Sequence, residues 1–139
     1  MSHLAGRGIL SALLVLLVHV AAWAEPVPVT ITSLDPRFDQ LVPKNAQVEK
    51  IADGFTWVEG PVWHKQGGYL LFSDIPANRV YQWKPGKGTR EKKKNSGYSG
   101  STPFAGKEPG SNGLTFSADG QLYLCRHGDR QIGRLEADG

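Results

Sequence analysis

The sequence lacks several features that commonly stabilise a protein, attract a charged partner or anchor a chain in a membrane. Cys125 is its only cysteine, so an exported form has no internal disulfide and must be stabilised by packing or by a metal ion. Charge of one sign is also lacking, because 16 Lys and Arg stand against 13 Asp and Glu. Nucleic-acid-binding proteins typically carry a clear excess of positive charge, so we expect no nucleic-acid partner.

A long apolar run is missing too. The run from Ile9 to Val20 is shorter than the roughly 20 apolar residues that a membrane span needs. It follows a start that carries Arg7 and precedes Ala22-Trp23-Ala24, a small-x-small cleavage pattern. Residues 1–24 are therefore predicted to be a secretory signal peptide, cleaved after Ala24. The mature chain would be periplasmic or extracellular, with no stable membrane insertion.

Helical periodicity is absent from the rest of the chain, which favours an all-β fold. No segment of ten residues or more shows the 3.6-residue period of an amphipathic helix. Residues 25–47 carry four prolines and are predicted to form an extended lead-in. Strand patterns then follow at 48–52, 57–63, 69–73 and 79–83.

Two further features are given ordinary structural interpretations. The basic run Lys92-Lys93-Lys94 is predicted to lie in a solvated loop rather than in a polyanion site. Cys125 falls in an apolar strand pattern, which predicts a small core residue rather than a nucleophile.

The second half of the chain repeats the first. Residues 112–120 line up with 59–67 at an offset of 53, and residues 131–135 line up with 79–83 at an offset of 52. Strand–turn–strand–turn–strand units at this spacing indicate the blades of a β-propeller, in residues 48–139. The alternative is two chance hairpins in a β-sandwich. Two blades cannot close a ring, and the chain ends on the turn signal Asp138-Gly139. We therefore expect this chain to be the N-terminal part of a longer protein.

The repeat also indicates where functional residues would lie. Glu59 and Asn112 occupy equivalent positions at the start of each unit's innermost strand. In a propeller such positions form a ring around the axis. A carboxylate and an amide oxygen on one ring are ligands for a hard divalent cation, to be completed by other blades and by water. The alternative for Glu59 is a solvated side chain beside a strand.

Long ordered motifs then resemble a known family. Residues 57–63 (Trp-Val-Glu-Gly-Pro-Val-Trp) and 70–83 resemble the first blade of the SMP-30/gluconolactonase/luciferin-regenerating-like family. Residues 97–103, 108–114 and 125–130 resemble its bacterial gluconolactonase branch, and the resemblance covers residues 47–139.

This resemblance implies a six-bladed β-propeller with one divalent cation near its axis. Calcium is the first expectation, with zinc, manganese or magnesium as alternatives. The implied reaction opens a sugar lactone such as glucono-1,5-lactone to its aldonic acid, water attacking a cation-polarised carbonyl. Glu59 matches the first metal ligand, and Asn112 matches an Asn that contacts substrate or metal-bound water. The other ligands and the proposed base would lie beyond residue 139, so this chain alone is expected to be inactive.

One position departs from the family pattern. Animal members carry a substrate-holding Arg two residues before the Asn, where this sequence has Gly110. His127, which follows the strand pattern at 122–125, is the predicted replacement in substrate binding; the alternative for it is a surface residue in a turn. Two competing functions remain open: a non-catalytic propeller that binds partners in the cell envelope, and a hydrolase of another lactone or ester on the same metal site.

Overall fold

The computed structural model describes residues 25–136, and this part of the chain is built of strands and turns. Its one helical element among these residues is a 3₁₀ turn, η1 (Phe38–Gln40). The all-β prediction is confirmed. No helix in residues 25–136 is long and apolar enough to cross a membrane. The predicted signal peptide, residues 1–24, lies outside the described residues.

The first sheet is an antiparallel meander of four strands in the order β3-β4-β5-β6. Its strands are β3 (Val58–His64), β4 (Tyr69–Asp74), β5 (Arg79–Lys84) and β6 (Gly88–Lys94). The first three agree with the predicted strands to within a residue at each end. Such a meander is the unit from which propellers are built.

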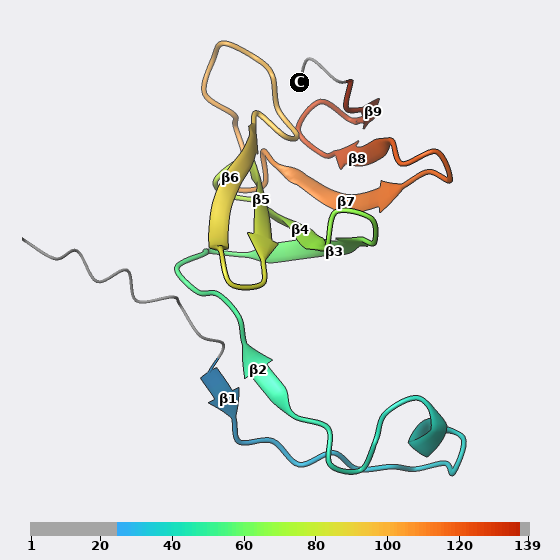
Figure 1. Cartoon of the computed structure of the whole chain (residues 1–139). Helices are drawn as coiled ribbons and strands as arrows, with labels where there is room; N and C mark the ends of the chain where they lie inside the picture. The colour runs from blue at the N-terminus through green and yellow to red at the C-terminus, as the bar shows by residue number, and fades with distance from the viewer. Residues whose placement is uncertain (1–24, 137–139) are drawn as a thin grey trace, which may run out of the picture.

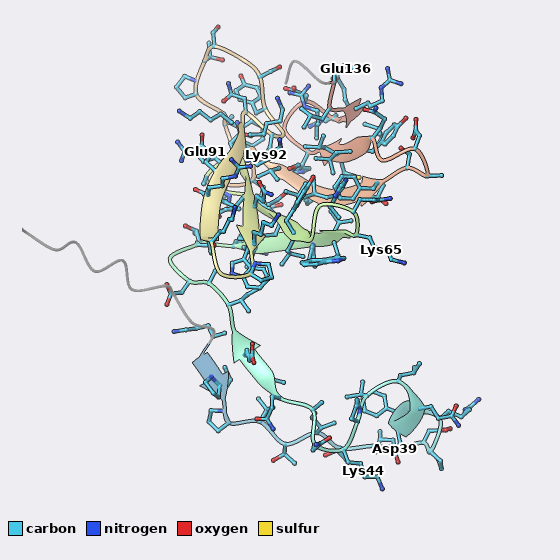
Figure 2. All side chains as sticks on the ribbon, in the orientation of Figure 1. Asp39, Lys44, Lys65, Glu91, Lys92 and Glu136 are labelled. Carbon is cyan, nitrogen blue, oxygen red and sulfur yellow. The ribbon has the colours of Figure 1, made fainter. Side chains whose placement is uncertain are left out.

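Strand β6 corrects the sequence interpretation, because the basic run predicted as a loop forms the sheet's outer edge. Arg79 Nε lies 2.7 Å from Glu91 Oε2, so a charged pair joins β5 to β6. Figure 2 shows Glu91 and Lys92 on this strand. Charged side chains on an exposed edge discourage pairing with another chain, which explains a strand with so little apolar content.

The second sheet repeats the meander with three strands in the order β7-β8-β9. They are β7 (Ser111–Phe116), β8 (Leu122–Arg126) and β9 (Gln131–Arg134). Figure 1 shows this sheet stacked beside the first, with β7 next to β3. The repeat found in the sequence therefore corresponds to two like sheets.

The hydrophobic core lies between these two sheets. Leu71 and Val80 of the first sheet pack with Leu122 and Leu124 of the second, and none is more than 5% exposed. Cys125 was predicted to join this core, but it is exposed. The reason is the two-residue period of a strand: with Leu122 and Leu124 facing the first sheet, Cys125 points to the opposite face.

The lead-in, residues 25–47, forms a separate arm together with the short strand that follows it. Strand β1 (Glu25–Val27) pairs with β2 (Val48–Lys50) in antiparallel register, and η1 lies between them in the sequence. Figure 1 shows this arm standing apart from both sheets. An ion pair of 3.6 Å between Asp39 and Lys44 closes the turn at η1 (Figure 2).

A long connection between the sheets, residues 95–110, is held near its start by polar side chains from both sheets. Asn78 accepts hydrogen bonds from the N–H groups of Gly97 (2.9 Å) and Tyr98 (3.2 Å). Asp129 accepts from the N–H and the hydroxyl of Ser99 at 3.1 and 2.9 Å, and it pairs with Arg126 at 2.8 Å. The connection is therefore clamped to a turn of each sheet.

Strands β3 and β7 approach so closely that a glycine is required at one position. Gly60 of β3 has φ +61°, and a Cβ added there would collide with the carbonyl oxygen of Asn112 and lie 3.0 Å from Leu114 N. The β3–β4 register also shifts between Glu59 and Val62, so Gly60 sits in a β-bulge. Only glycine satisfies the dihedral angle and the spacing together.

We predict that Gly60→Ala destabilises the protein more than Gly68→Ala. Gly68 has nearly the same φ, +60°, but open space around it, so its substitution carries only the left-handed backbone cost of about 1–2 kcal/mol. Chemical denaturation of both variants, made from the complete coding sequence, measures the difference. Equal losses would show that β3 and β7 do not depend on this contact.

The Asp129 clamp predicts a specific pH dependence. Hydrogen bonding from the Ser99 N–H, then from its hydroxyl, and the charge of Arg126 hold the pKa of Asp129 below its usual 3.8. A lowered folded-state pKa means that the clamp's contribution to stability is present above about pH 4 and is lost as pH falls through the folded value.

Comparing unfolding free energies of wild type and Asp129→Asn from pH 7 to pH 2.5 tests this dependence. Their difference should be constant near neutrality and shrink below pH 4, and using a difference cancels the other carboxylates. A difference that does not change with pH contradicts the assignment.

Candidate functional site

Glu59 lies on β3 directly before the Gly60 bulge, and its side chain is half-buried. Its neighbours Trp57 and Val58 are about half exposed, at 48% and 51%, so Glu59 is only partly surrounded by apolar groups. Among residues 25–136 the carboxylate of Glu59 makes no hydrogen bond or ion pair. Its carboxylate oxygens are therefore free of protein partners within this range and available to water or to a ligand.

Asn112 occupies the equivalent place on β7. The β7–β8 register shifts between Ser111 and Leu114, so Asn112 also sits at a bulge in an inner strand. It is half-buried, and its backbone carbonyl is the group against which Gly60 packs. The structure therefore brings the backbone that follows Glu59 against the backbone of Asn112, as the equivalence in the repeat predicts.

The two side chains border different hollows of the described surface. Asn112 and His127 line one open recess, together with Cys125, Arg126, Arg130, Gln131 and Ile132. Glu59 lines a mostly apolar recess on the first sheet, beside Phe55, Pro61 and Phe72. The structure thus brings Asn112 and His127 into one recess, whereas Glu59 joins them only through the contact of β3 with β7.

One ring nitrogen of His127 is held by the backbone of the 95–110 connection. Its Nδ1 lies 2.7 Å from the carbonyl oxygen of Glu108. A carbonyl only accepts hydrogen bonds, so Nδ1 carries the proton and Nε2 of the neutral ring is left as an acceptor. The side chain is 47% exposed and lines the Asn112 recess. It can therefore accept a hydrogen bond from a ligand hydroxyl.

The packing of the 95–110 connection explains the Gly110 departure. The N–H of Gly110 donates to the carbonyl of Ile75 at 3.0 Å, and a Cβ on Gly110 would lie 2.6 Å from that oxygen. An arginine cannot be placed there on this backbone. The substrate contact that the resemblance would put at this position is sterically excluded.

The donor set fits one part of a hard-cation site. Within residues 25–136 no three His, Cys, Asp or Glu side chains gather as a metal centre. Glu59 and Asn112 offer carboxylate and amide oxygens, the donors that calcium prefers, but calcium takes six to eight oxygens. These two residues could therefore hold a cation only together with further ligands.

One residue of the Asn112 recess, Arg130, was not singled out from the sequence. Arg130 lines the Asn112 recess, and in residues 25–136 its side chain makes no hydrogen bond or ion pair. The backbone of Arg130 has φ +55° in the turn Gly128-Asp129-Arg130, and only the structure reveals this conformation. Asp74 accepts hydrogen bonds from the N–H groups of Thr56 and Trp57, each at 3.2 Å. It thereby holds the chain that leads into Glu59.

Comparisons with known proteins identify a family and several relatives of this chain. The model of the SMP-30/Gluconolactonase/LRE-like region matches residues 57–139. A gluconolactonase of Zymomonas mobilis is 41% identical over 107 residues, which cover 76% of this chain and 30% of that protein.

Two solved structures are similar as well. A gluconolactonase from Xanthomonas campestris superposes with a TM-score of 0.66 at 27% identity, covering 87% of this chain and 37% of its own. A structural-genomics target assigned as a gluconolactonase gives 0.60 at 31% identity, covering 76% of this chain and 33% of its own.

This chain spans about a third of the length of these relatives. The family match extends over more than half of the chain and includes both inner strands, with Glu59 and Asn112. The chain belongs to the SMP-30/gluconolactonase/LRE-like family.

Proposed function

We propose that the protein to which this chain contributes is a metal-dependent hydrolase of sugar lactones. The observation that carries the proposal is Glu59, a half-buried carboxylate without a partner in residues 25–136, on the strand β3 whose Gly60 backbone packs against Asn112 at the junction of two like sheets. The 41% identity to a gluconolactonase supports the reaction class. Glucono-1,5-lactone, opened to gluconate, is the proposed substrate.

We propose further that the two sheets are the first blades of a six-bladed propeller. The β3–β6 and β7–β9 meanders pack side by side through their buried leucines, as successive blades do. In this arrangement β3 and β7 are the innermost strands, and Glu59 and Asn112 stand on one ring around the axis. Export is part of the proposal and rests on the signal-peptide pattern of residues 1–24.

Three residues of this chain have distinct roles in the proposed reaction. Glu59 would hold a divalent cation, calcium before zinc, manganese or magnesium, through its carboxylate. When bound, the cation supplies Lewis acidity toward the lactone carbonyl. Asn112 would orient the substrate or a water molecule through its amide, which both donates and accepts hydrogen bonds. His127 would accept a hydrogen bond from a sugar hydroxyl at Nε2, because Nδ1 is already bonded to the backbone carbonyl of Glu108.

The direct test is Glu59→Gln in the protein made from the complete coding sequence. Glutamine keeps the size of the side chain and removes its charge, so metal affinity should fall by more than about 100-fold, since even partners of a ligand are worth 10–100-fold. Titration with calcium or with terbium(III) measures the affinity, and glucono-1,5-lactone hydrolysis measures the activity. Glu49→Gln, an exposed carboxylate on β2, is the matched control.

The outcomes distinguish the alternatives. Normal metal binding and turnover in Glu59→Gln would falsify the site assignment. Metal binding without turnover of glucono-1,5-lactone moves the search to other lactones and esters. A wild-type protein that neither binds metal nor hydrolyses lactones is a non-catalytic propeller of the cell envelope.

A second prediction concerns His127. If Nε2 only accepts a substrate hydroxyl, His127→Ala should raise KM and leave kcat nearly unchanged, because the contact is made equally in ground and transition states. His64→Ala serves as the control: this histidine accepts the Gly67 N–H at 2.8 Å and stacks on Tyr69 away from the recess. Loss of kcat in His127→Ala would give the ring a role in the chemical step instead.

A further inference from the structure

Three buried serines form a row of hydroxyl groups between the two sheets. Ser73 lies on β4, Ser111 begins β7 and Ser96 follows β6, and each is 0% exposed. The Oγ atoms of Ser73 and Ser111 are 2.8 Å apart, and the N–H of Ser111 donates to Ser96 Oγ at 3.1 Å. The row thus joins the first sheet directly to the first residue of β7.

This row adjoins both candidate site residues. Glu59 is paired with Ser73 in the β3–β4 register. Asn112 follows Ser111 in the sequence. A shift of Ser111 relative to Ser73 would therefore shift Asn112 relative to Glu59.

The serine pair belongs to this junction and not to the general repeat. At the offset of 52 residues, the place of Ser73 in the second sheet is taken by Cys125, which is exposed. At the offset of 53 residues, the place of Ser111 in the first sheet is taken by Val58, which is 51% exposed. Where the sheets meet beside the site, Ser73 therefore stands in place of a cysteine and Ser111 in place of a valine.

The other contacts between the sheets leave their relative position less closely defined. Packing of Leu71, Val80 and Leu124 is favourable but not directional, so it permits small sliding movements. A hydroxyl pair requires a short distance and a suitable angle. Because both hydroxyls are buried, neither can exchange its partner for water, and leaving one unpaired is costly. The Ser73–Ser111 hydrogen bond therefore limits the distance between the two sheets, and Gly60 allows that distance to be short.

We propose that Ser73 and Ser111 are positioning residues that set the spacing of Glu59 and Asn112. They touch neither substrate nor cation and act through the strands that carry the site residues. The inference rests on the proposed function, because it takes Glu59 as the cation ligand. Disturbing the pair should weaken cation binding and the chemical step while the fold is kept.

The test uses Ser73→Ala, Ser111→Ala and the double variant in protein made from the complete coding sequence. Terbium(III) alone is the probe, and its luminescence is sensitised by Trp57, two residues before Glu59. Each single variant should raise the terbium dissociation constant about tenfold, the scale of losing a partner of a ligand. In lactone hydrolysis kcat should fall more than KM changes.

The double variant separates positioning from mere stability. Removing both hydroxyls leaves no unpaired buried group, so its melting temperature should recover relative to the single variants. Its terbium affinity should remain weakened, because the spacing is still undefined. Affinity that recovers together with stability would reduce the pair to a structural role and overturn the inference.

Ser117→Ala is the matched control for the single variants. Ser117 follows the other end of β7, where its hydroxyl donates to Asp119 and to the Gln121 carbonyl. Its substitution should lower the melting temperature and leave terbium affinity unchanged.

Glu59→Gln is measured in parallel to keep the two proposals distinct. If Glu59→Gln weakens terbium binding but both serine variants bind as wild type does, the positioning role is wrong and the proposed function stands. If Glu59→Gln binds terbium normally, both are overturned.

Discussion

The close approach of β3 and β7 is the constraint on which the candidate site depends. Gly60 has no side chain and a left-handed φ, so its backbone can lie against the carbonyl of Asn112. Glu59 precedes that contact, and Asn112 is part of it. The buried leucines between the sheets supply the driving force for this approach, but they would tolerate a looser arrangement. Glycine makes the closer one sterically accessible.

Polar groups then fix what apolar packing leaves free. Asp74 holds the backbone before Glu59, and the Ser73–Ser111 pair connects the two inner ends of the sheets. On the outer side, Asn78 and Asp129 clamp the connection 95–110. Buried or partly buried hydrogen bonds of this kind add specificity because they have a required geometry and few alternatives. The site is held by the backbone around it rather than by contacts to its own side chains.

A backbone contact at the far end of the same connection accounts for the glycine at position 110. Gly110 packs on the backbone of Ile75, so the connection lies too close to the first sheet for a long side chain at that position. The carbonyl of Glu108 on the same connection instead holds His127, which lines the recess beside Asn112. A backbone-held imidazole and a nearby guanidinium, Arg130, give this recess polar groups from a different part of the chain.

The sequence by itself determined the strand positions, the repeat and the equivalence of Glu59 with Asn112, because these follow from local periodicity and from order along the chain. It did not reveal β6, whose charges hide the strand pattern, or the exposure of Cys125, which depends on which face of β8 meets the first sheet. Only the tertiary structure decided the Gly60 contact and the serine pair. Those join residues 38 or more positions apart, and no local pattern encodes a distance between two sheets.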